Sequence, residues 1–162
     1  MHANAALVES LYDALSRRDA PAMAACYAPD ATFTDPVFDL RGGEVAAMWS
    51  MLCSRTRDLA VEWRNVEAGN ASGQGDWDAR YTFAATGRRV HNRIHSDFTF
   101  RAGRIVTQRD AFHLGRWLRM AVGPVAVLPG LSGWLARRVR RDARRTLDAW
   151  MAAHAGRAPS GT

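Results

Sequence analysis

The hydrophobic pattern of this chain changes its period once, near residue 59, and that change limits the folds open to it. Before residue 59, apolar residues such as Leu7, Leu11 and Leu15 recur at every third or fourth position, which predicts amphipathic helices. From Leu59 to Phe112, apolar and polar residues alternate between turn residues, which predicts consecutive antiparallel strands. Helices followed by such a meander predict an α+β fold, in which a curved antiparallel sheet wraps around the N-terminal helices and one pocket.

Start and stop signals divide the first third of the chain into helix, helix, strand and helix. Asp19 is typical of a helix N-cap and Pro21 of an early helical position, so a second helix is predicted through Tyr27. Pro36 holds Asp35 in extended backbone at the end of a short strand. The predicted elements cover residues 3–17, 19–27, 31–35 and, after two glycines, 45–52.

Two helical stretches follow the last strand, over residues 115–122 and 132–153, and form a C-terminal extension. Residues 1–113 hold 13 Arg and 14 acidic residues, a net charge of −1, whereas residues 114–162 hold 9 Arg and 2 acidic residues, a net charge of +7. The net charge of +6 therefore comes from the extension. We expect the apolar side of its second helix to pack on the outer face of the sheet, with the arginines in solvent. The six Arg between residues 137 and 145 leave open an anionic membrane or a nucleic acid as a partner.

The length of 162 residues suits one domain, predicted over residues 1–155 with the basic helix included, before a disordered tail at 156–162. No apolar run approaches the roughly 20 residues of a membrane span, and the N-terminus has no signal segment, which predicts a cytoplasmic protein. Cys26 and Cys53 lie in apolar helical patterns, which predicts buried free thiols. Neither cysteine has a metal-ligand spacing to another Cys or His, and we expect no metal and no cofactor.

Four segments together resemble one known superfamily. The first runs from Leu11 to Pro36 and contains the sequence YAPDATFTDP, and the others are residues 86–88, 98–105 and 108–112. They are similar to the nuclear transport factor 2-like superfamily, which includes the ketosteroid isomerases, limonene epoxide hydrolase and the SnoaL-like polyketide cyclases. The resemblance implies a cone-shaped sheet, an apolar small-molecule ligand, and a homodimer that forms through the outer face of the sheet.

Asp35 is the first catalytic candidate. It precedes a proline, as does the aspartate that acts as the base of the ketosteroid isomerases, and the resemblance implies the same role here. The isomerase tyrosine falls at Leu11, one position from Tyr12 and about 100° from it around the helix. The protonated isomerase aspartate falls at Ser96, which is a weaker hydrogen-bond donor. Two of the three isomerase groups are therefore altered.

Asp110 is the second catalytic candidate, and it matches an aspartate of limonene epoxide hydrolase. The Tyr and Asn that hold water in that enzyme match Phe33 and Asp35. The remaining Arg and Asp of its catalytic triad fall at Trp77 and Ala79, so hydrolysis of an epoxide by the same triad is not expected.

Two carboxylates that line one apolar cavity push their pKa values apart and so provide an acid and a base. We therefore expect Asp35 and Asp110 to move protons in an isomerase-like or cyclase-like reaction, or to activate water. The alternative is a protein that binds a hydrophobic ligand without catalysis, in which Asp35 caps a strand end and Asp110 pairs with an Arg. Asn92, Ser96 and Gln108 are expected to orient a substrate oxygen or to form hydrogen bonds with one another. The side chains expected to line the pocket are Tyr12, Phe33, Trp49, Trp63, Tyr81, Asn92, Ser96, Phe98, Gln108 and Phe112.

Overall fold

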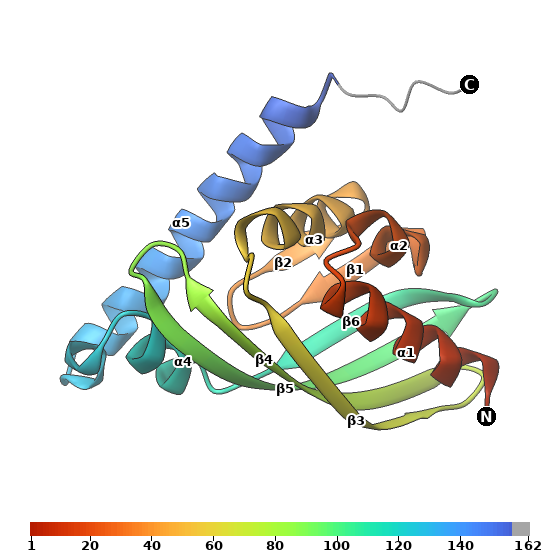
Figure 1. Cartoon of the computed structure of the whole chain (residues 1–162). Helices are drawn as coiled ribbons and strands as arrows, with labels where there is room; N and C mark the ends of the chain where they lie inside the picture. The colour runs from red at the N-terminus through yellow and green to blue at the C-terminus, as the bar shows by residue number, and fades with distance from the viewer. Residues whose placement is uncertain (157–162) are drawn as a thin grey trace.

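The computed structural model describes residues 1–156 and confirms the α+β class (Figure 1). The N-terminal helices lie against the concave side of a strongly curved sheet, because the apolar stripe of each helix packs on the inward side chains of the strands. The helices are α1 (Ala3–Ser16), α2 (Ala20–Ala25), α3 (Gly43–Arg55), α4 (Leu114–Ala121), the short 3-10 helix η1 (Pro124–Val127) and α5 (Leu131–His154). The strands are β1 (Tyr27–Thr34), β2 (Asp39–Arg41), β3 (Ala60–Ala68), β4 (Ser72–Phe83), β5 (Arg88–Arg101) and β6 (Arg104–Ala111).

The sheet has six strands in the order β2-β1-β6-β5-β4-β3. The predicted meander is confirmed, since β3, β4, β5 and β6 pair antiparallel with their neighbours in sequence. β1, however, runs parallel to β6, so the prediction of a wholly antiparallel sheet is wrong at this edge. β1 also begins at Tyr27, where the second helix was expected to continue. Pairing with a strand almost 80 residues away in sequence decides both points, and local patterns carry no signal for it.

A tight turn sets the register of β5 against β6. Ala102 and Gly103 both have positive φ, at 51° and 71°, which matches the twist of a two-residue hairpin loop. One extra residue, Val106, then lies between the paired positions of β6, so Ile105 rather than Val106 is buried. Past this bulge, the alternation returns to phase and Ser96 lies directly opposite Asp110.

The C-terminal extension turns back over the helical side of the molecule. α4 packs against β5, and α5 then crosses α4 and α3, where Leu147 is fully buried. Arg144 forms an ion pair with Glu44 of α3 at 2.7 Å, and Arg140 donates to the carbonyl of Pro36 at 2.8 Å. The predicted contact between this helix and the outer face of the sheet is therefore wrong. An amphipathic helix needs one apolar partner surface, and here α3 and α4 supply it.

Cys26 and Cys53 are buried free thiols, as predicted. Within residues 1–156, no helix is both long and apolar enough to cross a membrane. Residues 157–162 of the predicted disordered tail lie outside the described residues.

Candidate functional site

Asp110 lies near the end of β6 with its side chain on the concave side of the sheet, and it is only 5% exposed. Its Oδ1 atom accepts two hydrogen bonds, from Ser96 Oγ at 2.6 Å and from Gln108 Nε2 at 2.9 Å. Both donors are themselves buried on the concave side, because alternate residues of β5 and β6 point inward. The expected pairing of Asp110 with an Arg is absent from the described contacts, since its partners there are neutral.

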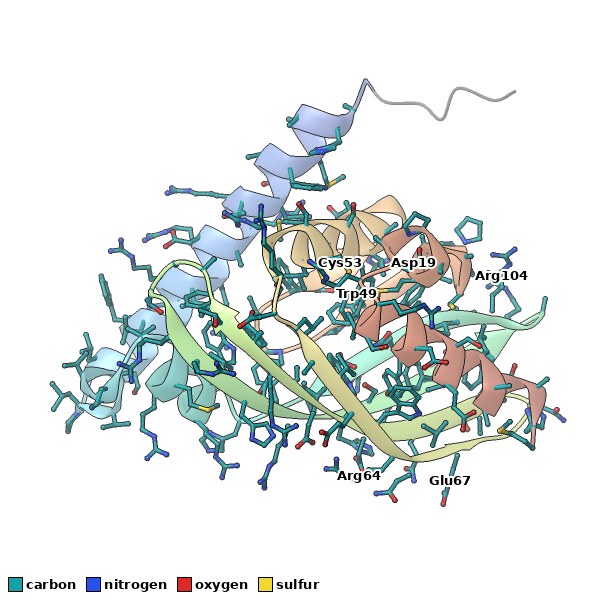
Figure 2. The ribbon with its side chains drawn as sticks, in the orientation of Figure 1. Asp19, Trp49, Cys53, Arg64, Glu67 and Arg104 are labelled. Atoms are coloured by element: carbon teal, nitrogen blue, oxygen red, sulfur yellow. The ribbon has the colours of Figure 1, made fainter. Side chains whose placement is uncertain are left out.

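Further hydrogen bonds connect Ser96 and Gln108, the two donors to Asp110, to other buried side chains. Trp77 Nε1 donates to Ser96 Oγ at 3.0 Å. On the other side, Trp49 Nε1 donates to Tyr27 Oη at 2.9 Å, and this hydroxyl donates to Gln108 Oε1 at 2.5 Å. Figure 2 shows Trp49 between α3 and the sheet, where its ring nitrogen can reach this chain of groups. These hydrogen bonds all lead to one carboxyl oxygen, Oδ1 of Asp110. We use the name Asp110 cluster for the six residues that form them: Tyr27, Trp49, Trp77, Ser96, Gln108 and Asp110.

Burial raises the pKa of the Asp110 carboxyl to about 7. The hydrogen bonds from Ser96 and Gln108 offset part of this rise because they stabilise the charged form, and the negative charge of Asp35 adds to it. A carboxyl group whose pKa lies near neutrality can both accept and donate a proton, which suits general acid–base chemistry.

Tyr12 of α1 points its ring into the same region. Its ring centroid lies 6.3 Å from Trp63, 5.9 Å from Trp77 and 6.3 Å from Phe98. Gly75 of β4 permits this position, since a Cβ atom there would lie 3.0 Å from the Tyr12 hydroxyl oxygen. The helical position that faces the sheet is therefore Tyr12 itself, one residue after the position to which the isomerase tyrosine was aligned.

The hydroxyl of Tyr12 is buried and has no hydrogen-bond partner within residues 1–156. Burial raises the pKa of Tyr12, the nearby Ser96 hydroxyl offsets part of this rise although its geometry does not make a hydrogen bond, and the charge of Asp110 adds to it, so the phenol stays protonated. Leaving a buried hydroxyl without a partner typically costs about 1–3 kcal/mol. A donor of this kind beside Ser96 and Asp110 is suited to an oxygen atom that a ligand would bring.

Asp35 follows β1 directly and is half-buried. Its Oδ1 atom accepts the backbone N–H groups of Val37 at 2.7 Å and Phe38 at 2.6 Å, which is the turn that the alternative reading predicted. Burial raises the pKa of Asp35, and these two N–H groups partly offset the rise. Burial raises the pKa of Tyr81, and the negative charge of Asp35 adds to that rise, so Asp35, Asp110 and Tyr81 belong to one electrostatic environment.

The remaining predicted residues line the same concave side. Phe33 and Trp49 pack edge to face at 5.5 Å, and Phe112 packs between the main core and α4. Asn92 is 8% exposed, and its side chain has no hydrogen bond within the described part of the chain. Tyr81 Oη accepts a hydrogen bond from Trp117 Nε1 of α4 at 2.8 Å, so the C-terminal extension reaches the site.

Large side chains occupy the concave side of the sheet, where Tyr12, Phe33 and Phe98 are almost fully buried. Two hollows occur on the surface, one between Glu67 and Ser72 at the end of the β3–β4 hairpin and one between His113 and Ser132 in the extension. Neither is lined by Asp35 or Asp110.

The outer face of the sheet carries a separate set of charged pairs. His91 Nε2 lies 2.7 Å from Asp78, and His95 Nδ1 lies 2.7 Å from Asp76, so both histidines point away from the cone interior. Arg64 lies 3.0 Å from Asp78 and projects on this side of the sheet (Figure 2). Within residues 1–156, no group of three or more His, Cys, Asp or Glu side chains is placed to hold a metal ion.

Three residues near the site were not among those predicted for it. Tyr27 was assigned to a helix, Trp77 was considered as the position of a missing triad residue, and Trp117 lies in an extension that was not connected with the pocket. Each has a hydrogen-bonding group on a large ring, and buried Tyr and Trp side chains usually find a polar partner. This tendency is the property of the sequence that could have indicated these three residues as members of the site.

The model of the SnoaL-like domain family matches residues 8–108 of this chain. The chain belongs to the SnoaL-like family. The match ends before α4, so the helical extension lies outside the part that this family model describes. A comparison with curated proteins gave no match.

Several solved structures share the fold. One is a nuclear transport factor 2-like protein of unknown function from Burkholderia pseudomallei, with a TM-score of 0.65 and 21% identity, covering 76% of this chain and 100% of that one. Another is an LEH-like epoxide hydrolase from M. tuberculosis, with a TM-score of 0.64 and 22% identity over 78% of this chain and 95% of that one. A third, from Catenulispora acidiphila, has a ketosteroid isomerase-like fold and contains trimethylamine, with a TM-score of 0.65 and 13% identity over 76% and 97% of the two chains. At these identities the likeness concerns the fold alone.

Proposed function

We propose that this SnoaL-like protein is an acid–base enzyme that moves a proton on an apolar, oxygenated small molecule, in an isomerase-like or cyclase-like reaction. The observation that carries the proposal is the buried Asp110 carboxyl, whose pKa is raised to about 7 and which lies near the unpartnered hydroxyl of Tyr12. Perturbed carboxyl groups in enclosed sites mark functional positions more often than surface charges do.

In the proposed reaction, Asp35 and Asp110 have different protonation states. Asp110 holds a proton at neutral pH for a large share of the time, because its charged form is poorly solvated. Asp35 is half-buried, and its Oδ1 atom is fixed by two backbone N–H groups, which leaves Oδ2 to accept a proton from a carbon next to a carbonyl group. The hydroxyl of Tyr12 and protonated Asp110 then donate to the oxygen on which negative charge develops. Asn92 supplies a further polar group on the same wall.

The aromatic surround favours the proposed class of substrate. Tyr12, Trp63, Trp77 and Phe98 form one contiguous group of rings around the Asp110 cluster. Rings of this kind bind a flat or ring-shaped apolar molecule, while few polar groups fix its orientation.

A second function is supported by the turn at Asp35. Since Oδ1 of Asp35 accepts the N–H groups of Val37 and Phe38, its carboxylate has a structural role that needs no reaction. A protein that binds a hydrophobic ligand in the same cone, without turnover, is consistent with this. Water activation resembling that of epoxide hydrolases is the remaining chemistry that we propose to test.

The test is a thermal-shift screen with ring-shaped ketones, enones and epoxides, followed by a turnover assay of each compound that binds. We expect Asp35→Asn and Asp110→Asn each to lower kcat by about 10²–10⁴-fold, as loss of a general acid or base does, with the ligand Kd changed only a few-fold. Tyr12→Phe should lower kcat more than it changes Kd, because its hydroxyl acts mainly on the developing oxyanion.

Two outcomes separate the alternatives. If compounds bind the wild type and both Asn variants equally and none is turned over, the binding function replaces the enzyme. If turnover occurs only with epoxides, survives Asp35→Asn and is lost in Asp110→Asn, the reaction is water activation by Asp110.

A further inference from the structure

The exposed large apolar side chains of this protein are concentrated in a segment of eleven residues. Apart from Met1, those exposed within the described chain are Val125 at 55%, Val127 at 59%, Leu128 at 53% and Trp134 at 46%. They lie in η1, in the turn that follows it and in the first turn of α5, which we call the apolar tip (residues 124–134). Figure 1 shows this turn projecting at the edge of the molecule, far from the N-terminus. Scattered exposed apolar residues are ordinary, but a contiguous group marks an interaction surface.

Arginines continue the surface along α5. At about 100° per residue, Arg138, Arg141 and Arg145 share one face of the helix with Trp134, opposite the buried face that contains Leu147. All three arginines are exposed, and the Arg138 guanidinium lies over the Trp134 ring at 5.4 Å from its centroid. Arginine that stacks on an interfacial tryptophan suits a boundary between an apolar and a charged medium.

A hollow of about 370 Å³ lies beside the apolar tip. Its lining includes the side chains of Arg116 and Arg119, the hydroxyl of Ser132 and the apolar Val127. Neither of these two arginines lies within 4.0 Å of an acidic group in residues 1–156. The hollow thus offers two cations and a hydroxyl donor directly next to the exposed apolar side chains.

The extension contains two acidic residues, Asp142 and Asp148. Asp142 lies 3.5 Å from Arg138 and 3.9 Å from Arg141, so it offsets part of the positive charge on this face of α5, whereas Arg116, Arg119 and Arg145 form no such pair within residues 1–156. The hydrophobic tip, the arginines around it and the scarcity of acids together match the chemistry of an anionic bilayer, which combines apolar chains with phosphate groups. A nucleic acid would account for the arginines but would leave Val125, Val127 and Leu128 exposed in water.

We propose that the apolar tip docks on an anionic phospholipid membrane, with Val127, Leu128 and Trp134 entering the acyl boundary and Arg116 and Arg119 holding a lipid phosphate in the hollow. The site lies in the extension that follows the family domain, and it is independent of the proposed reaction. Docking would hold the cone at a surface where apolar substrates concentrate.

The test is flotation of the full chain with vesicles of phosphatidylcholine alone, or of phosphatidylcholine and phosphatidylglycerol in equal parts. Wild type should float with the anionic vesicles and release as salt rises. The double variant Val127→Ser/Leu128→Ser should lose roughly tenfold or more in partition, because each side chain would bury apolar surface.

Charge variants provide a matched comparison. Arg116→Gln/Arg119→Gln should lose about fivefold in partition per arginine, the effect expected of one basic residue near an anionic surface. Arg17→Gln/Arg57→Gln removes two exposed arginines elsewhere and should bind like the wild type. Circular dichroism should show that each variant is folded.

A fluorescence measurement locates the contact. Brominated acyl chains should quench the wild-type emission, and Trp134→Phe should bind the vesicles with most of that quenching lost. Equal binding to neutral and anionic vesicles, or no binding at low salt, overturns the proposal. The proposal is also overturned if the apolar variant binds vesicles as the wild type does, or if the wild type binds double-stranded DNA but no vesicles. A third contrary result is an apolar variant that differs from the wild type only by a smaller mass in sedimentation.

Discussion

At the scale of single residues, the Asp110 carboxyl links the fold to pH. The pKa of this group rises from 3.8 to about 7 on burial, so the native state holds the proton more tightly than the unfolded chain does. The contribution of this group to the free energy of unfolding is therefore fully present below about pH 4, where the carboxyl is protonated in both states. That contribution is lost as pH rises from about 4 to 7. Above that range the cost of the buried charge is constant.

We predict that Asp110→Asn is more stable than the wild type at pH 8, by about 1–3 kcal/mol, and that the difference shrinks toward pH 5. Its Oδ1 atom keeps an acceptor for Ser96 and Gln108, while the buried charge is removed. Urea unfolding at both pH values measures this, with the exposed Asp39→Asn as the control. Parallel pH profiles for Asp110→Asn and the wild type would show that the carboxyl is not perturbed.

At the scale of elements, the apolar residues of the C-terminal extension differ in how deeply they are buried. Leu147 is fully buried against the main core, whereas Leu128, just before the helix, is 53% exposed. We predict that Leu147→Ala lowers the free energy of unfolding by about 2–5 kcal/mol, because it leaves a cavity between α5 and α3. Leu128→Ala deletes the same atoms and should change stability by less than about 0.5 kcal/mol. Chemical denaturation of both variants checks the pair, and equal effects would mean that α5 does not pack on the core.

At the scale of the whole molecule, we predict a homodimer that forms through the outer face of the sheet. Two-fold symmetry brings the same patch of both copies together, so a substitution that reverses a charge places two changed residues in the one interface. Arg93, exposed at the centre of β5 on that face, lies opposite Asp78 in the register. Arg93→Glu should weaken the dimer at least tenfold in sedimentation velocity, while Arg57→Glu, outside the sheet, should not. A wild type that sediments as a monomer at all concentrations contradicts the prediction.

The site illustrates which parts of the molecule local patterns can predict. Strict alternation along β5 and β6 was enough to predict that Ser96, Gln108 and Asp110 point to the same side. Tyr12 was predicted to line the pocket, but its close approach to Gly75 and the β1 start at Tyr27 were not predicted. Both depend on packing between segments far apart in the chain, namely Tyr12 against Gly75 and β1 against β6.

The sequence by itself determined the α+β class, the four-stranded meander and the two helices of the extension, because these follow from periodicity and turn residues within short windows. The family was inferred differently, from the resemblance of segments such as YAPDATFTDP to known proteins, and the family model matches residues 8–108. Only the tertiary structure decided the parallel pairing of β1 with β6, the packing of α5 on α3, and the contact between Trp117 and Tyr81. The apolar face of an amphipathic helix does not specify which surface it packs against, because any complementary apolar surface can bury it. The choice among such surfaces depends on the three-dimensional path of the whole chain.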